Sequence, residues 1–133
     1  MLRFMLDTSI LIYTIKRKPD VVRRRFEAHN GELCASSITA MELLYGAHTS
    51  QAVRRNLEIV EGLLGRLELL DFDLAAAEHA GQILAELTTA GIPIGPFDVM
   101  IAGHARSRGL RLVTNNEGEF SRFRGLLLEN WSK

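Results

Sequence analysis

Short apolar runs alternate with longer amphipathic stretches along the chain. The apolar runs are too short for helices, and most of them end at polar residues that favour turns or helix caps. They cover residues 3–6, 33–36, 67–70 and 110–113, and a shorter run covers 126–128. Each run predicts a buried strand, and the stretches between them predict helices.

Polar side chains mark where the predicted helices begin. Asp7, Thr8 and Ser9 supply capping oxygens for the first helix, and Thr39 and Glu42 stand three residues apart, as in a capping box. The alternation predicts an α/β fold, with helices on both faces of a parallel sheet of about five strands. The helices are predicted at residues 10–15, 19–29, 39–44, 50–65, 73–89 and 98–108, and an irregular segment at 91–97 precedes the last of them.

Length and charge narrow the class of protein. A chain of 133 residues fits one domain over 1–133 and can bury a core without disulfides, in agreement with its single cysteine, Cys34. Its 16 basic and 16 acidic residues cancel, so nucleic acid would have to bind at a local basic patch. No signal peptide is visible in the sequence, and no apolar run approaches the roughly 18 residues of a membrane span. We expect a cytoplasmic protein that does not enter a membrane.

Three acidic residues fall where parallel α/β sheets bind ligands, beyond the carboxyl ends of the strands. Asp7 follows the first predicted strand, Glu42 lies one turn into the helix after the second, and Asp98 begins the helix before the fourth. Close carboxylates repel one another unless a cation compensates their charge, and hard oxygen ligands favour Mg²⁺ or Mn²⁺. The arrangement predicts an acidic, Mg²⁺-type site, and such an ion acidifies bound water and stabilises charge on a phosphodiester.

Each acid also has a purely structural interpretation. Asp7 and Asp98 are suited to cap the helices that follow them, and Glu42 is suited to the far half of the capping box. Asp71 and Asp73, after the third predicted strand, are typical of turn and cap residues. The functional interpretation therefore depends on the convergence of several acids and not on any one of them.

Four short motifs stand in order along the chain. They are Met5-Leu6-Asp7-Thr8-Ser9, the segment 36–43, Phe97-Asp98 with Ile101-Ala102, and the segment 113–116 before Glu119-Phe120. In sequence and spacing they resemble PIN-domain ribonucleases and, more narrowly, VapC toxins of VapBC toxin–antitoxin modules. The resemblance extends over essentially the whole chain, down to residues 129–131.

The resemblance implies a PIN-like three-layer sandwich and an endoribonuclease that depends on Mg²⁺, with Mn²⁺ as a substitute. The family's core acids fall on Asp7, Glu42 and Asp98. Asp7 and Asp98 would hold the metal, directly or through water, and Glu42 would help to orient the attacking water. Asn116 stands where many members have a fourth acid, so Glu119 is the expected substitute. Supporting hydroxyl groups fall on Thr8, Ser9, Ser37 and Thr114.

The resemblance also implies partners. A VapB-type antitoxin would lay a helix or an extended segment across the toxin and block its site, and homodimers are typical of the family. The substrate would be structured RNA, commonly a tRNA anticodon loop, and the stretches 95–98 and 102–107 resemble the subgroup that attacks initiator tRNA. Candidate groove residues are Leu11, Ile12, Tyr13, Ile15, Leu43, Leu44 and Tyr45, most of which are equally suited to the core. Candidate RNA contacts are His104, Arg106 and Arg108, with Arg122 and Arg124 nearer the C-terminus.

Other classes of protein share parts of this pattern. A haloacid-dehalogenase-type phosphatase requires a second Asp two positions after the first, where this chain has Ser9. A receiver-type domain requires a lysine after its last strand, and no lysine is placed for that role. A PIN-like binding module without catalytic activity would keep the same acids, so the sequence leaves it open beside the nuclease.

Overall fold

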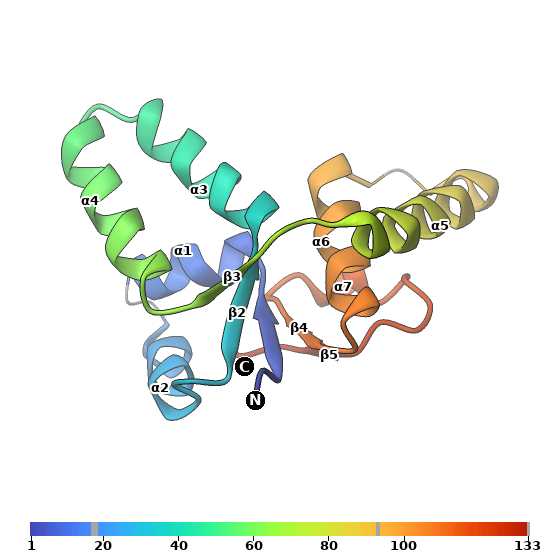
Figure 1. Cartoon of the computed structure of the whole chain (residues 1–133), viewed down its shortest axis with the longest axis horizontal. Helices are drawn as coiled ribbons and strands as arrows, with labels where there is room; N and C mark the ends of the chain where they lie inside the picture. Colours follow the sequence, from blue (N-terminus) through green and yellow to red (C-terminus); the bar gives the residue numbers. More distant parts are fainter. Residues whose placement is uncertain (17–18, 93, 133) are drawn as a thin grey trace.

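The fold is built on a parallel β-sheet (Figure 1). The structure is a computed structural model and describes residues 1–16, 19–92 and 94–132. Within these residues the sheet has five strands in the order β3-β2-β1-β4-β5, and each neighbouring pair is parallel. The strands are β1 (Phe4–Leu6), β2 (Leu33–Ser36), β3 (Glu68–Leu70), β4 (Arg111–Val113) and β5 (Leu128–Glu129). The helices are α1 (Thr8–Lys16), α2 (Asp20–Ala28), α3 (Ser37–His48), α4 (Val53–Leu64), α5 (Leu74–Ala90), α6 (Pro96–Ser107) and α7 (Glu117–Phe120). In the part of the chain that is described, no helix combines the length and the apolar character needed to cross a lipid bilayer.

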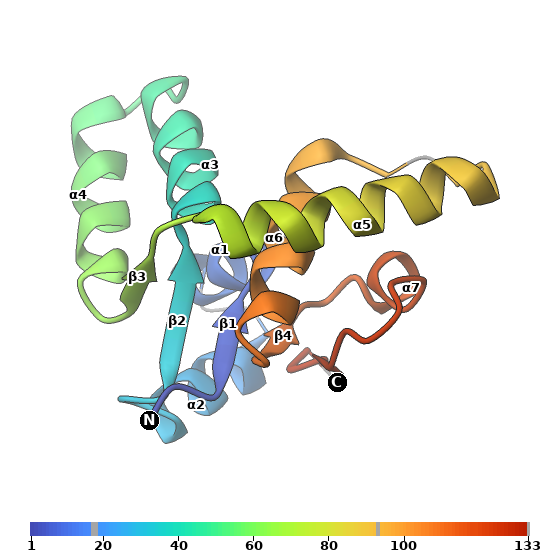
Figure 2. The same ribbon diagram turned by 45° about the vertical axis from the view of Figure 1, so that its right-hand side comes forward.

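Side chains of the central strands alternate between two separate cores. Phe4 and Leu6 of β1 belong to the core that includes residues of α1 to α4, whereas Met5 between them belongs to the core that includes residues of α5 to α7. Successive strand residues point to opposite faces, so this alternation buries the sheet on both sides. Helices α1 to α4 and α5 to α7 accordingly lie on opposite sides of the sheet (Figures 1 and 2). The predicted three-layer α/β sandwich is confirmed.

The chain reverses the direction in which it adds strands to the sheet between β1 and β4. From β1 the chain adds β2 and β3 on one side, and β4 and β5 on the other. The backbone N–H of Asp7, just past β1, donates to the carbonyl of Val113 at the end of β4 (3.0 Å). Open α/β sheets bind ligands beyond the strand ends at such a reversal. The topology therefore brings the residues after β1 and β4 to the same place.

Helix α3 begins differently from the prediction. Its first residue is Ser37, and Ser36 is its N-cap, because the Ser36 hydroxyl accepts a hydrogen bond from the Ile38 amide (3.1 Å). The predicted capping box of Thr39 and Glu42 is therefore wrong. Both residues lie inside the helix, where their side chains are available for contacts with α1.

Other boundaries also differ from the predictions. Helix α4 begins at Val53, because the Ser50 hydroxyl donates back to the Ala47 carbonyl (2.6 Å) and Ser50 stays outside the helix. Helix α6 begins at Pro96, two residues before the predicted start, because proline is well tolerated in a first helical turn. The sequence pattern did not predict α7, and β5 lies later than the predicted 126–128. The predicted irregular segment 91–97 includes residue 93, which lies outside the described residues.

A glycine brings α5 and α6 into close contact. A Cβ atom on Gly103 would lie 2.5 Å from the Ala80 amide nitrogen and 2.6 Å from the Ala80 Cα. These distances are far below van der Waals contact, so a larger residue does not fit between the two helices. Because α6 carries Asp98 on its first turn, the contact at Gly103 also sets the position of that acid.

Candidate active site

Asp7 lies at the centre of the site, directly after β1, and its side chain is buried. Its Oδ1 accepts hydrogen bonds from the Ile10 amide (2.9 Å) and the Ser9 hydroxyl (2.8 Å). A further hydrogen bond comes from the side chain of Thr114, just past β4. Burial raises the pKa of Asp7, these bonds lower it and the charge of Glu42 raises it, with a net upward shift. Asp7 therefore caps α1 and also presents a buried carboxyl group at the reversal point of the sheet.

Glu42 reaches the site from the second turn of α3. The Thr8 hydroxyl donates to Glu42 Oε1 (2.7 Å), and this bond joins α1 to α3. Thr8 Oγ1 also lies 3.5 Å from the hydroxyl of Thr39. The negative charge of Glu42 raises the pKa of both Asp7 and Asp98, so Glu42 lies among the acids and does not serve as a helix cap.

Asp98 lies in the first turn of α6 and faces a further acid, Glu119 of α7. Burial raises the pKa of Asp98 most, followed by a hydrogen bond with Glu119 and by the charges of the other three acids; together they raise it to about 7. The raised pKa keeps Asp98 protonated below about pH 7, beside Glu119. Four acids converge here, from the end of β1, α3, α6 and α7.

The segment after β4 holds Glu119 in this position. Asn116 Nδ2 donates to Glu119 Oε2, and the Asn116 backbone amide donates to the Thr114 hydroxyl (2.9 Å). The Ser9 hydroxyl, which binds Asp7, also contacts the side chain of Asn115. Of the two candidates for the fourth position, Glu119 faces Asp98, whereas Asn116 orients Glu119. Sequence reasoning found both residues but had no signal for the short helix that places them.

An apolar surface borders the acids. A cavity of about 470 Å³ lies beside Glu42, and its exposed Tyr45 and Phe97 rings flank the acid. A second cavity of about 290 Å³ lies between α1, α3 and α4. Of the residues predicted for an antitoxin groove, Leu11 and Leu43 are buried in the core, whereas Ile12 and Tyr45 are exposed. The remaining three, Tyr13, Ile15 and Leu44, are partly buried against that core.

Two of the predicted site residues, Ser37 and His104, form contacts within the fold and not with the acids. The Ser37 hydroxyl accepts a hydrogen bond from the Phe72 amide (3.1 Å), so it ties α3 to the segment after β3. His104 is 0% exposed, its Nδ1 lies 2.8 Å from the Ser36 hydroxyl, and its ring packs edge-on against Phe72. Burial lowers the pKa of His104, which keeps the ring neutral. RNA cannot reach a fully buried ring, so the assignment of His104 to RNA binding does not fit its position.

Two of the arginines predicted to bind RNA, Arg106 and Arg108, lie toward the far end of α6. Arg106 donates to His79 Nδ1 (2.9 Å) and to the carbonyl of Arg124 (2.8 Å), so its guanidinium group is occupied. It lies eight residues after Asp98, which corresponds to about 12 Å along a helix axis. Arg108 follows the end of the helix and is exposed. Neither arginine lies beside the four acids.

Known proteins are similar to this chain in sequence and in fold. The PIN domain family matches residues 4–126. The chain belongs to the PIN-domain family. Within the family it is 60% identical over 132 residues to the tRNA(fMet)-specific endonuclease VapC of Shigella flexneri, across 99% of this chain and 100% of that protein. It is 57% identical to the protein of the same name from Salmonella typhimurium, across 98% and 99% of the two chains. The crystal structure of DNA-bound VapBC from Salmonella typhimurium matches with a TM-score of 0.95 at 57% identity, covering 98% of this chain and 99% of that one. The resemblance to VapC proteins is confirmed.

PIN-domain ribonucleases generally depend on a divalent metal ion. The donor set of this PIN domain, four carboxyl groups, suits a hard divalent cation. Burial is the main cause of the raised pKa values of Asp7 and Asp98, and the negative charges of neighbouring acids raise them further. Among the described residues, no three His, Cys, Asp or Glu side chains are arranged to hold an ion. Asp98 and Glu119 contact each other in this arrangement, and a cation bound there would compensate the charges of both.

Proposed function

We propose that the chain is a toxin endoribonuclease that hydrolyses phosphodiester bonds in RNA at the four converging acids. The observation that carries this proposal is the convergence of four carboxyl groups, from the end of β1, α3, α6 and α7, at the reversal point of the sheet. Natural folds seldom keep such mutual repulsion without a use, and perturbed acids cluster at functional sites. Family membership supports the same chemistry.

Each acid has a role that follows from its contacts. Asp7 and Asp98 would hold the cation, Mg²⁺ or in its place Mn²⁺, directly or through water. When bound, the ion supplies positive charge at the scissile phosphate and acidifies a water molecule. Glu42, oriented by the Thr8 hydroxyl, accepts a hydrogen bond from the attacking water. Glu119, beside Asp98, would serve as the fourth acid of the site. The products would be a 5′-phosphate and a 3′-hydroxyl.

We propose structured RNA, and in particular the anticodon region of initiator tRNA, as the substrate. The Shigella flexneri and Salmonella typhimurium relatives are named tRNA(fMet)-specific endonucleases. The exposed rings of Tyr45 and Phe97 beside Glu42 suit this substrate, because loop bases that are not paired stack on aromatic side chains. Cleavage of this tRNA would inhibit translation, and the reaction would take place in the cytoplasm, where the tRNA is.

A VapB-type antitoxin is the proposed partner. The related Salmonella typhimurium structure is that of a VapBC complex. The cavity between α1, α3 and α4 is mostly apolar and includes Ile12, Ile15 and Ile59 together with Glu42. An amphipathic segment that fills it would lie directly beside the catalytic acids and block them. Homodimerisation stays a prediction of the family resemblance.

RNA cleavage tests the proposed function. The purified chain is incubated with a pool of tRNAs that includes initiator tRNA, with Mg²⁺ or with EDTA, and the fragment ends are mapped. We expect a discrete cut in initiator tRNA that requires the ion and leaves a 5′-phosphate. Binding of RNA or of an antitoxin without any cut would favour the alternative, a catalytically silent PIN-like binding module.

A further inference from the structure

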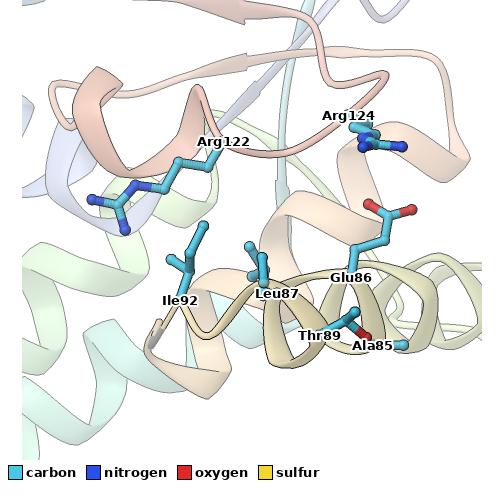
Figure 3. Close-up of a pocket in the computed structure, with 8 residues that line it drawn as sticks. Ala85, Glu86, Leu87, Thr89, Ile92, Arg122 and Arg124 are labelled. Atoms are coloured by element: carbon cyan, nitrogen blue, oxygen red, sulfur yellow. The ribbon is translucent and has the colours of Figure 1, made fainter.

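A cavity of about 590 Å³ lies beside the C-terminal part of the chain, away from the apolar surface of α3. One wall is formed by the C-terminal half of α5 with Leu87 and by Ile92 just after it, and the other is formed by Arg122 and Arg124 (Figure 3). Figure 3 shows both arginines on the same side of the cavity, across from α5.

Several arginines on the other side of the molecule are paired with acids. Arg3, Arg23 and Arg25 each lie within 3.5 Å of a carboxylate oxygen, so their charges are compensated within the chain. Within the residues that the structure describes, Arg122 and Arg124 form no such ion pair, and both are exposed. A guanidinium group without an internal acid is available to an external anion, and its planar fork matches the geometry of phosphate.

The segment that carries the two arginines is held in place. Phe123, between them, is buried against Phe120 with ring centroids 5.5 Å apart, so its two neighbours are directed outward. The Arg106 guanidinium group donates to the Arg124 carbonyl (2.8 Å) and is itself anchored by Gln82 of α5 (2.9 Å). A segment fixed in this way loses little conformational freedom when a ligand binds.

Residues of both walls are close in sequence to the catalytic acids. Arg122 follows Glu119 by three residues, and three residues of chain span at most about 11 Å. Ile92, on the opposite wall, precedes Asp98 by six residues. An RNA strand whose scissile phosphate lies at the acids therefore carries its neighbouring phosphates within reach of this loop.

We propose that Arg122 and Arg124 bind backbone phosphates of the RNA substrate next to the cleavage position. This inference rests on the proposed function, because the RNA is the substrate of the four acids. The chain has no net charge that would attract RNA as a whole, so a local pair of uncompensated arginines supplies the attraction. The negative charge of Glu86, on the α5 wall, weakens this attraction for phosphates. Figure 3 shows the Glu86 carboxylate below Arg124.

The test measures RNA binding separately from cleavage. Fluorescence anisotropy of labelled initiator tRNA is recorded in EDTA over a series of salt concentrations, for the wild type and for Arg122→Gln/Arg124→Gln. The control variant is Arg54→Gln/Arg55→Gln, which removes the same charge from an exposed pair on α4. All four positions are exposed, so folding is not expected to change.

We expect the Arg122/Arg124 variant to bind at least tenfold more weakly at low salt. The slope of log affinity against log salt should fall by about 1.4 to 1.8, the value for two lost phosphate contacts. Glu86→Gln should bind more tightly than the wild type. In the cleavage assay KM should rise with kcat unchanged. Equal affinity and equal slope for the two double variants would overturn the inference. Binding through these arginines without cleavage would uphold it and refute the proposed function.

Discussion

Replacement of Gly103 by alanine should separate α5 from α6 and disturb the site without touching any acid. The new Cβ would lie 2.5 Å from the Ala80 amide nitrogen, where ordinary contact requires about 3.5 Å. The two helices must therefore move apart by about 1 Å, because the opposing atoms belong to the backbone of α5 and cannot rotate away. Gly81, the next residue in α5, has no atom within 4 Å of its own Cβ position.

The two alanine variants should change stability in opposite directions. Overpacking of this kind costs about 1–3 kcal/mol of unfolding free energy, which lowers Tm by about 4–10 °C for a chain of this size. Gly81→Ala should instead gain about 0.5–1 kcal/mol, because alanine favours the helix where space is open. Because α6 carries Asp98, Gly103→Ala should also reduce RNA cleavage, whereas Gly81→Ala should leave it unchanged.

Circular dichroism measures the thermal and urea unfolding of the two variants. Cleavage rates are measured at temperatures where both variants are folded. Equal stability of Gly103→Ala and the wild type would refute the packing argument. Lower stability with full activity would refute the link between the helix contact and Asp98.

Further predictions concern ionisation. Because the pKa of Asp98 is raised to about 7 in the folded protein and lies near 4 in an unfolded chain, the folded state holds a proton there that the unfolded state has lost. We therefore expect the difference in Tm between the metal-free wild type and Asp98→Asn to fall as pH rises from about 4 to about 7. A rise of this difference over the same pH range would contradict the raised pKa of Asp98. Glu119→Gln removes a hydrogen bond and a charge that raise this pKa, so the fall should shift to lower pH in the same melting series. Burial raises the pKa of the Cys34 thiol to about 12, so a thiol reagent at pH 8 should label it only after unfolding in guanidinium; rapid labelling of the native protein would show that β2 is accessible.

The local pattern of apolar and polar residues was sufficient to predict the strands, the longer helices and the main acids of the site. Apolar runs and caps predict β1, β2 and β4 within one residue, because a buried strand must be apolar and must end at a polar turn. Asp7 and Asp98 follow from their places at the strand and helix ends. Glu42 was found as well, although its contact is a bond from Thr8 of another helix and not the predicted cap.

What the sequence did not reveal depends on contacts between distant segments. Helix α7 has four residues, including a glycine, and is too short for a periodic signal; its position follows from bonds that join Asn116 to Thr114 and Glu119. His104 was predicted as a candidate RNA contact, yet it is buried and flanked by the small residues Gly103 and Ala105, which are part of the same helix. That flanking pattern was a signal for burial within α6.

The central claim is that the four acids cleave RNA, and the rate of initiator tRNA cleavage in Mg²⁺ by Asp7→Asn tests it most directly. The control is Asp71→Asn, which changes an exposed acid that also follows a strand. Asparagine keeps the oxygen that accepts from the Ile10 amide, so the fold should be unchanged by circular dichroism. The account predicts at least a thousandfold loss for Asp7→Asn, on the order of 4 kcal/mol of transition-state stabilisation, and no loss for Asp71→Asn. Cleavage by Asp7→Asn at the wild-type rate would contradict the account.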